Sequence, residues 1–194
     1  NSTWGDSMPT VTHVSDGMVT VYVKASKANY SDAKGSATIK INARAIEITA
    51  GSSTGNVYNG SEYSVTTSSI TSVQKMVEGD SYTVDFENNK RTEAGSQTVS
   101  VKDAVVDSGT AEQTDYSFTY KTGTLTVNKK ALTITAKNQT KTKGKTFTFA
   151  GTEFTTNGLV GTDSVTSVEL TSTGAPASAA VGTHPIVISE NSAI

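Results

Sequence analysis

The sequence contains no cysteine among its 194 residues. This absence excludes disulfide bonds, catalysis by a thiolate and zinc sites built from cysteine ligands. Exported proteins of animals often rely on disulfides, so an exported protein without them fits a bacterial surface better than an animal secretory pathway.

Charge of one sign and long apolar runs are lacking too. The formal net charge is −2, and the lysines and arginines form no basic block of the kind that binds the phosphates of nucleic acid. No apolar run approaches the roughly 20 residues of a membrane-spanning helix. We therefore expect no nucleic-acid partner and no membrane insertion of this segment. The sequence starts at Asn1 without a signal peptide, so we expect an internal piece of a longer exported protein.

Residues that carry chemistry are scarce. The two histidines, His13 and His184, belong to no Ser-His-Asp order, and no G-x-S-x-G, H-E-x-x-H or EF-hand pattern is present. Asp85 and Glu87 share one face of a predicted strand, which indicates solvated carboxylates rather than an acid–base pair. We therefore expect a protein that is not an enzyme, with no catalytic residue, no cofactor and no metal.

What the sequence does contain is a repeat. The 22 residues from Asn29 to Ala50 recur as Asp115–Ala136, at an offset of 86 residues and without a gap. Two further blocks accompany this segment in the same order each time. One is "GMVTVYVK" from Gly17, "GSQTVSVK" from Gly95 and "GTHPIVIS" from Gly182; the other is "NVYNGSEYSV" from Asn56 and "KTKGKTFTF" from Lys141. Blocks that recur in a fixed order indicate a chain built from repeated units.

The order of the blocks predicts three modules. Residues 1–43 correspond to the C-terminal half of a preceding repeat, 44–128 to a complete module, and 129–194 to a third module that stops before its last hairpin. The joint at 128–130 is short and polar, with no flexible linker, so we expect an elongated, rod-like monomer.

Period-two alternation predicts a mainly β fold of small antiparallel modules. Leu125 and Val127 fall on one strand face, and Val99 and Val101 fall on another. Residues 121–123 are predicted to form a three-residue hairpin loop, with Gly123 at positive φ. The turns at Asn59-Gly60, Asn157-Gly158 and Gly144 are predicted from their turn residues. One short helix per module is considered, at 69–79 and at 154–163.

These blocks resemble the MBG domains of bacterial surface proteins, repeat modules related to the mucin-binding (MucBP) type. The resemblance rests on the "LTITA" strand, on Val57-Tyr58-Asn59-Gly60, on "GLVGTD" at 158–163 and on the closing "GTLTV". The chain departs from the pattern at Lys143 and His184, where the family has tyrosine. The resemblance implies a sandwich-like or β-grasp-like module, with no catalytic residues to carry over. It also implies a location outside the cell, at a bacterial surface, in a stalk or adhesin.

Two functional alternatives stay open at this level. In the first, the chain acts as a stalk, spacer or adhesion module. In the second, it binds host glycan, mucin or matrix protein in its own right. A further hypothesis is that it is an accessory region of a larger secreted enzyme. Trp4 and Tyr63 are the aromatic residues least tied to the repeat, so they are the candidates for contact with a sugar. Lys24 and Lys102 lie in matched strands and are candidates for an isopeptide cross-link.

Overall fold

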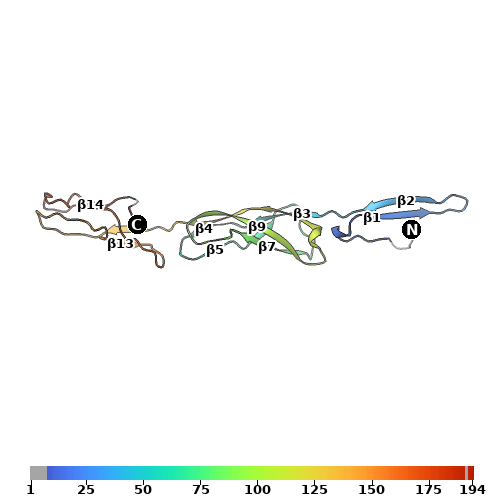
Figure 1. Cartoon of the computed structure of the whole chain (residues 1–194), viewed down its shortest axis with the longest axis horizontal. Coiled ribbons are helices and arrows are strands. Elements are labelled where there is room, and N and C mark those ends of the chain that lie inside the picture. Colours follow the sequence, from blue (N-terminus) through green and yellow to red (C-terminus); the bar gives the residue numbers. More distant parts are fainter. Residues whose placement is uncertain (1–7, 191) are drawn as a thin grey trace. The chain divides into compact units, whose positions relative to one another are not determined.

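The computed structural model, drawn in Figure 1, describes residues 8–190 and 192–194. Strands make up 43% of it. The mainly β prediction is confirmed. Two single 3₁₀ turns are the helical elements of the described part, and none of its helices is long and apolar enough to cross a membrane. The chain divides into two compact units. One comprises Asn1–Asn56, Glu62–Arg91 and Gly95–Val127; the other comprises Val57–Ser61, Thr92–Ala94 and Asn128–Ile194.

The elements follow the chain in this order. The first unit carries η1 (Val14–Asp16), β1 (Val19–Ala25), β2 (Ala33–Ile39), β3 (Arg44–Ala50), β4 (Ser53–Val57), β5 (Tyr63–Ser64), β6 (Ser68–Ile70), β7 (Ser81–Glu87), β8 (Lys90–Arg91), β9 (Gly95–Ser108), η2 (Gln113–Asp115), β10 (Tyr116–Lys121) and β11 (Gly123–Asn128). The second carries β12 (Thr133–Ala136), β13 (Phe154–Asn157), β14 (Leu170–Ser172) and β15 (Ile186–Ile188).

Two sheets of the first unit share one core. Their strand orders are β10-β3-β6 and β4-β11-β9-β7, and β5 pairs with β8 beside them. Ile48 of β3, Val99 of β9 and Leu125 of β11 are each 0% exposed and belong to a single apolar cluster. Apolar side chains from both sheets therefore meet face to face, which is the sandwich-like alternative. A β-grasp module would need a helix against its sheet, but the helical elements among the described residues are two short 3₁₀ turns.

The predicted hairpin at 121–123 is wrong. β10 pairs in parallel with β3, whereas β11 pairs antiparallel with β9 in the other sheet, so the chain passes between sheets at Thr122. The segment from β3 to β4 makes the same passage beside it, at Gly51. A Cβ on Gly123 would lie 1.8 Å from the carbonyl oxygen of Gly51. Glycine is required here by this close backbone approach and not by a positive φ.

Neither of the two segments considered for a short helix is helical. Residues 68–70 form β6 and Phe154–Asn157 form β13, followed by bends or turns. Both strands pair antiparallel with the first strand of their repeat, β3 and β12. Pairing with a neighbouring strand outweighed the weak local preference for helix. The predicted turn glycines are confirmed, because Gly60, Gly144 and Gly158 all have positive φ.

The sequence repeat is a structural repeat with conserved strand registers. In β9–β11 the paired residues include Thr98↔Thr124 and Gln97↔Leu125. In β1–β2 the residues at the matched sequence positions pair in the same way, as Thr20↔Thr38 and Val19↔Ile39. The β1–β2 pair therefore has the same register as the β9–β11 pair. β1 precedes its counterpart β9 by 78 residues, whereas β2 precedes its counterpart β11 by 86 residues.

Residues of the third module repeat the opening of the middle one. Ala50 pairs with Ser68, and 86 residues later Ala136 pairs with Phe154. The hydrogen bond from Gly51 N–H to Thr67 O, 2.7 Å, recurs as Lys137 N–H to Glu153 O, 2.8 Å. The pair β14–β15 likewise matches β7–β9, since Leu170↔Ile188 stands where Phe86↔Val101 does.

Burial differs between the matched positions. Ile48 and Val99 are fully buried in the first unit, whereas their counterparts Ile134 and Ile186 are only partly buried. Val168 and Leu170 are the buried hydrophobic residues among the described part of the second unit. The described residues of that unit contain no counterpart of β10 and β11, the strands that complete the core of the middle repeat.

Candidate functional site

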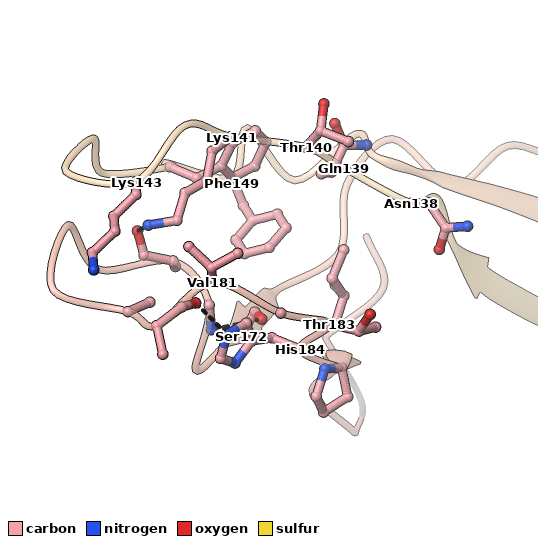
Figure 2. Close-up of a pocket in the computed structure, with 18 residues that line it drawn as sticks. Asn138, Gln139, Thr140, Lys141, Lys143, Phe149, Ser172, Val181, Thr183 and His184 are labelled. Carbon is pink, nitrogen blue, oxygen red and sulfur yellow. Dashed lines mark hydrogen bonds between the residues drawn. The ribbon is translucent and has the colours of Figure 1, made fainter.

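The second unit carries a pocket of about 630 Å³, drawn in Figure 2. The pocket is lined by residues from three parts of the chain: from within 138–143, the aromatic pair Phe147 and Phe149, and from within 172–186, between the end of β14 and the start of β15. All of them belong to one unit, so the pocket is a feature of this repeat alone. We call it the β14–β15 pocket.

Two phenylalanines form the apolar part of the pocket. The rings of Phe147 and Phe149 meet edge to face, with centroids 5.0 Å apart and an interplanar angle of 70°. Burial alternates along this segment, because both phenylalanines are partly buried while Thr146 and Thr148 are exposed. The segment is nevertheless not a regular strand; its hydrogen bond from Phe147 N–H to Ala175 O, 2.9 Å, attaches it to the turn after β14.

The lysines of the pocket have different roles. Lys141 Nζ donates to the backbone oxygens of Lys145 at 2.8 Å, Ala175 at 3.3 Å and Pro176 at 2.5 Å. Its charge therefore joins two loops and is not directed to a ligand. Lys143 is exposed, and in Figure 2 its side chain extends away from the Phe149 ring.

His184 is a structural histidine. Its Nε2 lies 3.0 Å from the Ala180 carbonyl oxygen, which can only accept, so Nε2 carries the proton. Nδ1 then accepts from the Thr173 hydroxyl at 3.3 Å. Gly174 packs against the ring so closely that a Cβ there would lie 2.8 Å from His184 Cβ. With both nitrogens bound to the protein, the ring is not placed to act as a base.

The second histidine lies in an ionic cluster of the first unit. His13 Nδ1 is 2.6 Å from Asp115 Oδ2, and Asp115 Oδ1 accepts from the Val14 N–H at 2.7 Å. The hydrogen bond to Asp115 raises the pKa of His13 above its usual 6.5; partial burial opposes the rise, and the nearby carboxylates of Glu112 and Asp16 add to it. Burial acts to raise the pKa of Asp115, but hydrogen bonds from the Glu112 N–H, His13 and the Val14 N–H outweigh it and lower this pKa. Sequence reasoning missed this cluster, because its two partners are distant in the chain.

Tyr63, one of the two residues predicted to contact sugar, does not line the pocket. Trp4 lies outside the described residues. Tyr63 forms β5, where it pairs with Arg91 and packs, partly buried, against the core of the first unit. Its role in binding stays a prediction.

Other candidate residues have structural surroundings. Asp85 and Glu87 are exposed on β7, in keeping with solvated carboxylates. Lys24 forms an ion pair with Asp32 at 2.5 Å, and Lys102 is exposed. Among the described residues, no group of three or more His, Cys, Asp or Glu side chains could hold a metal ion.

The fold defines this chain as a tandem β repeat. Residues 132–194 match the family model of the MBG domain (YGX type). The resemblance predicted from the sequence is thus confirmed for this segment, and the domain that it matches is a non-catalytic repeat type typical of surface proteins. Searches of curated proteins and of solved structures gave no significant match.

Proposed function

We propose that the chain is a non-catalytic repeat region of a bacterial cell-surface protein and acts there as a stalk or spacer. One observation carries the proposal: the same strand registers recur along the chain, so its length is built by repeating one β unit. Stacking a repeated unit whose contacts are mainly local is how repeat proteins gain length. The match of residues 132–194 to a family typical of surface proteins supports a position outside the cell.

The test combines shape with binding. Small-angle scattering should give a radius of gyration well above the roughly 16 Å of a compact chain of this length. The same protein is applied to an array of mucins, host glycans and matrix proteins, beside a Trp4→Ala, Tyr63→Ala variant. We expect an extended particle without dose-dependent binding. A compact particle, or binding that the variant loses, would replace the spacer role with that of a binding module.

A further inference from the structure

The chain contains two Asn-Gly dipeptides, and they lie in different structural surroundings. Asn59-Gly60 is part of the bend that follows β4, where Asn59, Gly60 and Ser61 are all exposed. Asn157 is instead the last residue of β13, where it pairs with Thr133 of β12. The same dipeptide therefore occurs once in an open turn and once at the end of a paired strand.

An Asn-Gly link can be modified without an enzyme. The backbone nitrogen of the glycine attacks Cγ of the asparagine, the attacking nitrogen gives its proton to solvent, and the side-chain nitrogen leaves as ammonia. The product is a five-membered succinimide ring. Water then opens this ring at either carbonyl carbon, which leaves aspartate or isoaspartate. Glycine favours the reaction because it has no side chain to obstruct the attack.

The turn at Asn59 holds the side chain in an arrangement that assists this reaction. The Ser61 N–H donates to Asn59 Oδ1 at 2.9 Å, which is the contact of an Asx turn. The contact closes the side chain over the intervening Gly60 peptide unit, so Cγ lies beside the nitrogen that attacks it. The same N–H polarises the side-chain carbonyl and stabilises the negative charge that develops on Oδ1 during the attack.

The attacking nitrogen is available as well. Among the described residues, none accepts a hydrogen bond from the Gly60 N–H, so no such bond has to break before the attack. Gly60 has a φ of 77°, in the left-handed region that favours glycine. Because the turn is exposed, solvent can take up the proton and the ammonia and can supply the water that opens the ring.

Asn157 is placed unfavourably for the same reaction. No group in the described part of the chain donates to its side-chain oxygen, so nothing polarises that carbonyl. Its main chain is paired in β13, whereas ring closure turns the Asn-Gly link out of the extended conformation. Gly158 also packs so closely on Ala131 that a Cβ there would lie 2.3 Å from the Ala131 carbonyl oxygen. This link must therefore open locally before it can react.

We propose that Asn59 is a site of spontaneous modification, where the Gly60 nitrogen displaces the side-chain amide and leaves aspartate or isoaspartate. Aspartate adds a negative charge to the turn, and isoaspartate also changes the path of the main chain. The modification goes beyond the role of a spacer, because it alters one turn of the repeat as the protein ages.

The turn also makes contacts that isoaspartate would disturb. Val57–Ser61 belong to the second unit, in which Tyr58 Oη donates to Asp163 Oδ1 at 3.4 Å. A Cβ on Gly60 would lie 3.0 Å from Val160 Cγ1 of the same unit. Isoaspartate places an extra carbon in the main chain between Tyr58 and Gly60, so the two cannot both keep these positions. Amide hydrogen exchange at 158–163 should therefore be faster in the isoaspartate form.

The test uses the intact chain and compares its two Asn-Gly sites. The folded protein is incubated in mildly alkaline buffer and digested, and mass spectrometry follows the replacement of the side-chain amide by a carboxylate in each peptide. Isoaspartate is identified by enzymatic methylation of its carboxylate. We expect Asn59 to react about tenfold or more faster than Asn157, because a hydrogen bond to a developing oxyanion accelerates attack by at least this factor.

A second incubation in concentrated urea separates the effect of the fold from that of the dipeptide. The two sites should then react at similar rates, because the turn and the strand are both lost. An Asn59→Ser variant keeps a side-chain oxygen for the turn but cannot form the ring, so its peptide should stay unmodified. The proposal would be overturned by a ratio of the two rates that is the same with and without urea, by faster reaction at Asn157 in the folded protein, or by reaction at Asn59 in urea alone.

Discussion

His13 and Asp115 lie 102 positions apart in the sequence, yet their side chains are 2.6 Å apart between Nδ1 and Oδ2. The contact brings the turn η1 against the turn η2 within the first unit. Ser15 Oγ donates to Glu112 Oε2 in the same cluster, so two side-chain pairs join the turns.

This pair should make the attachment of η1 dependent on pH. The hydrogen bond to Asp115 raises the pKa of His13 in the folded protein. The stabilisation that protonated His13 gives to the fold is therefore fully present below pH 6.5, and it is lost as pH rises through this raised pKa. The pKa of Asp115 is lowered in the folded protein. The stabilisation that its ionised carboxylate gives to the fold is therefore fully present above pH 3.8, and it is lost as pH falls through this lowered pKa. In an NMR titration, the His13 ring should have a midpoint above 6.5, and Asp115→Asn should lower it. Asp85→Asn, which alters an exposed carboxylate, should leave it unchanged; equal effects of both variants would contradict the assignment.

Gly123→Ala should destabilise the first unit. The new Cβ would lie 1.8 Å from Gly51 O and 2.7 Å from Ala50 O, and backbone atoms cannot yield without moving β3 and β11. We expect a loss of about 1–3 kcal/mol or more in the free energy of unfolding, measured in urea. Gly55→Ala in β4 is the matched control, since nothing lies within 4 Å of a Cβ there. Similar losses in both variants would show that strand glycines in general, and not this crossing, limit stability.

Leu125→Ala should remove part of the core of the first unit. Its side chain is 0% exposed, so its truncation should cost about 2–5 kcal/mol. Thr124→Ala alters the exposed neighbour on the same strand and should change stability by less than about 0.5 kcal/mol. Thermal and urea unfolding of the two variants provide the comparison, and a neutral Leu125→Ala would refute the placement of β11 over the core.

Backbone amides of the third module should exchange faster than those at matched positions of the middle one. Thr49 lies between two hydrogen-bonded neighbour strands, β10 and β6, whereas Thr135 in β12 pairs only with β13 among the described strands. Native-state hydrogen exchange should therefore show lower protection at 133–136 than at 47–50. Equal protection, with one unfolding transition for the whole chain, would contradict this expectation.

Sequence reasoning found the elements whose signal is local. The alternation at Leu125 and Val127 placed both side chains in the core, and Asn59-Gly60 marked a turn. It did not predict which strands pair when the two partners are distant in the sequence. Two strands separated by one residue look like a hairpin in the sequence, but β10 pairs with β3 and β11 pairs with β9, so they belong to different sheets.

The candidate site was less accessible to sequence reasoning. The closing Gly-Thr-Leu-Thr-Val segment is not repeated within residues 129–194, and this was visible in the sequence. The β14–β15 pocket was not predicted, because its lining residues come from segments that are distant in the sequence. The contact of His13 with Asp115 carries no local pattern at all, because it depends on how two distant turns fold together.

The parallel pairing of β3 with β10 has a mechanical consequence. Six residue pairs, from Arg44↔Tyr116 to Thr49↔Lys121, lie along this ladder. Tension applied to the start of β3 and to the end of β11 would pull the two parallel segments past each other along their length. The hydrogen bonds of the ladder would then share the load in shear instead of opening one at a time. A repeat joined to its neighbours through these two ends is built to resist stretching.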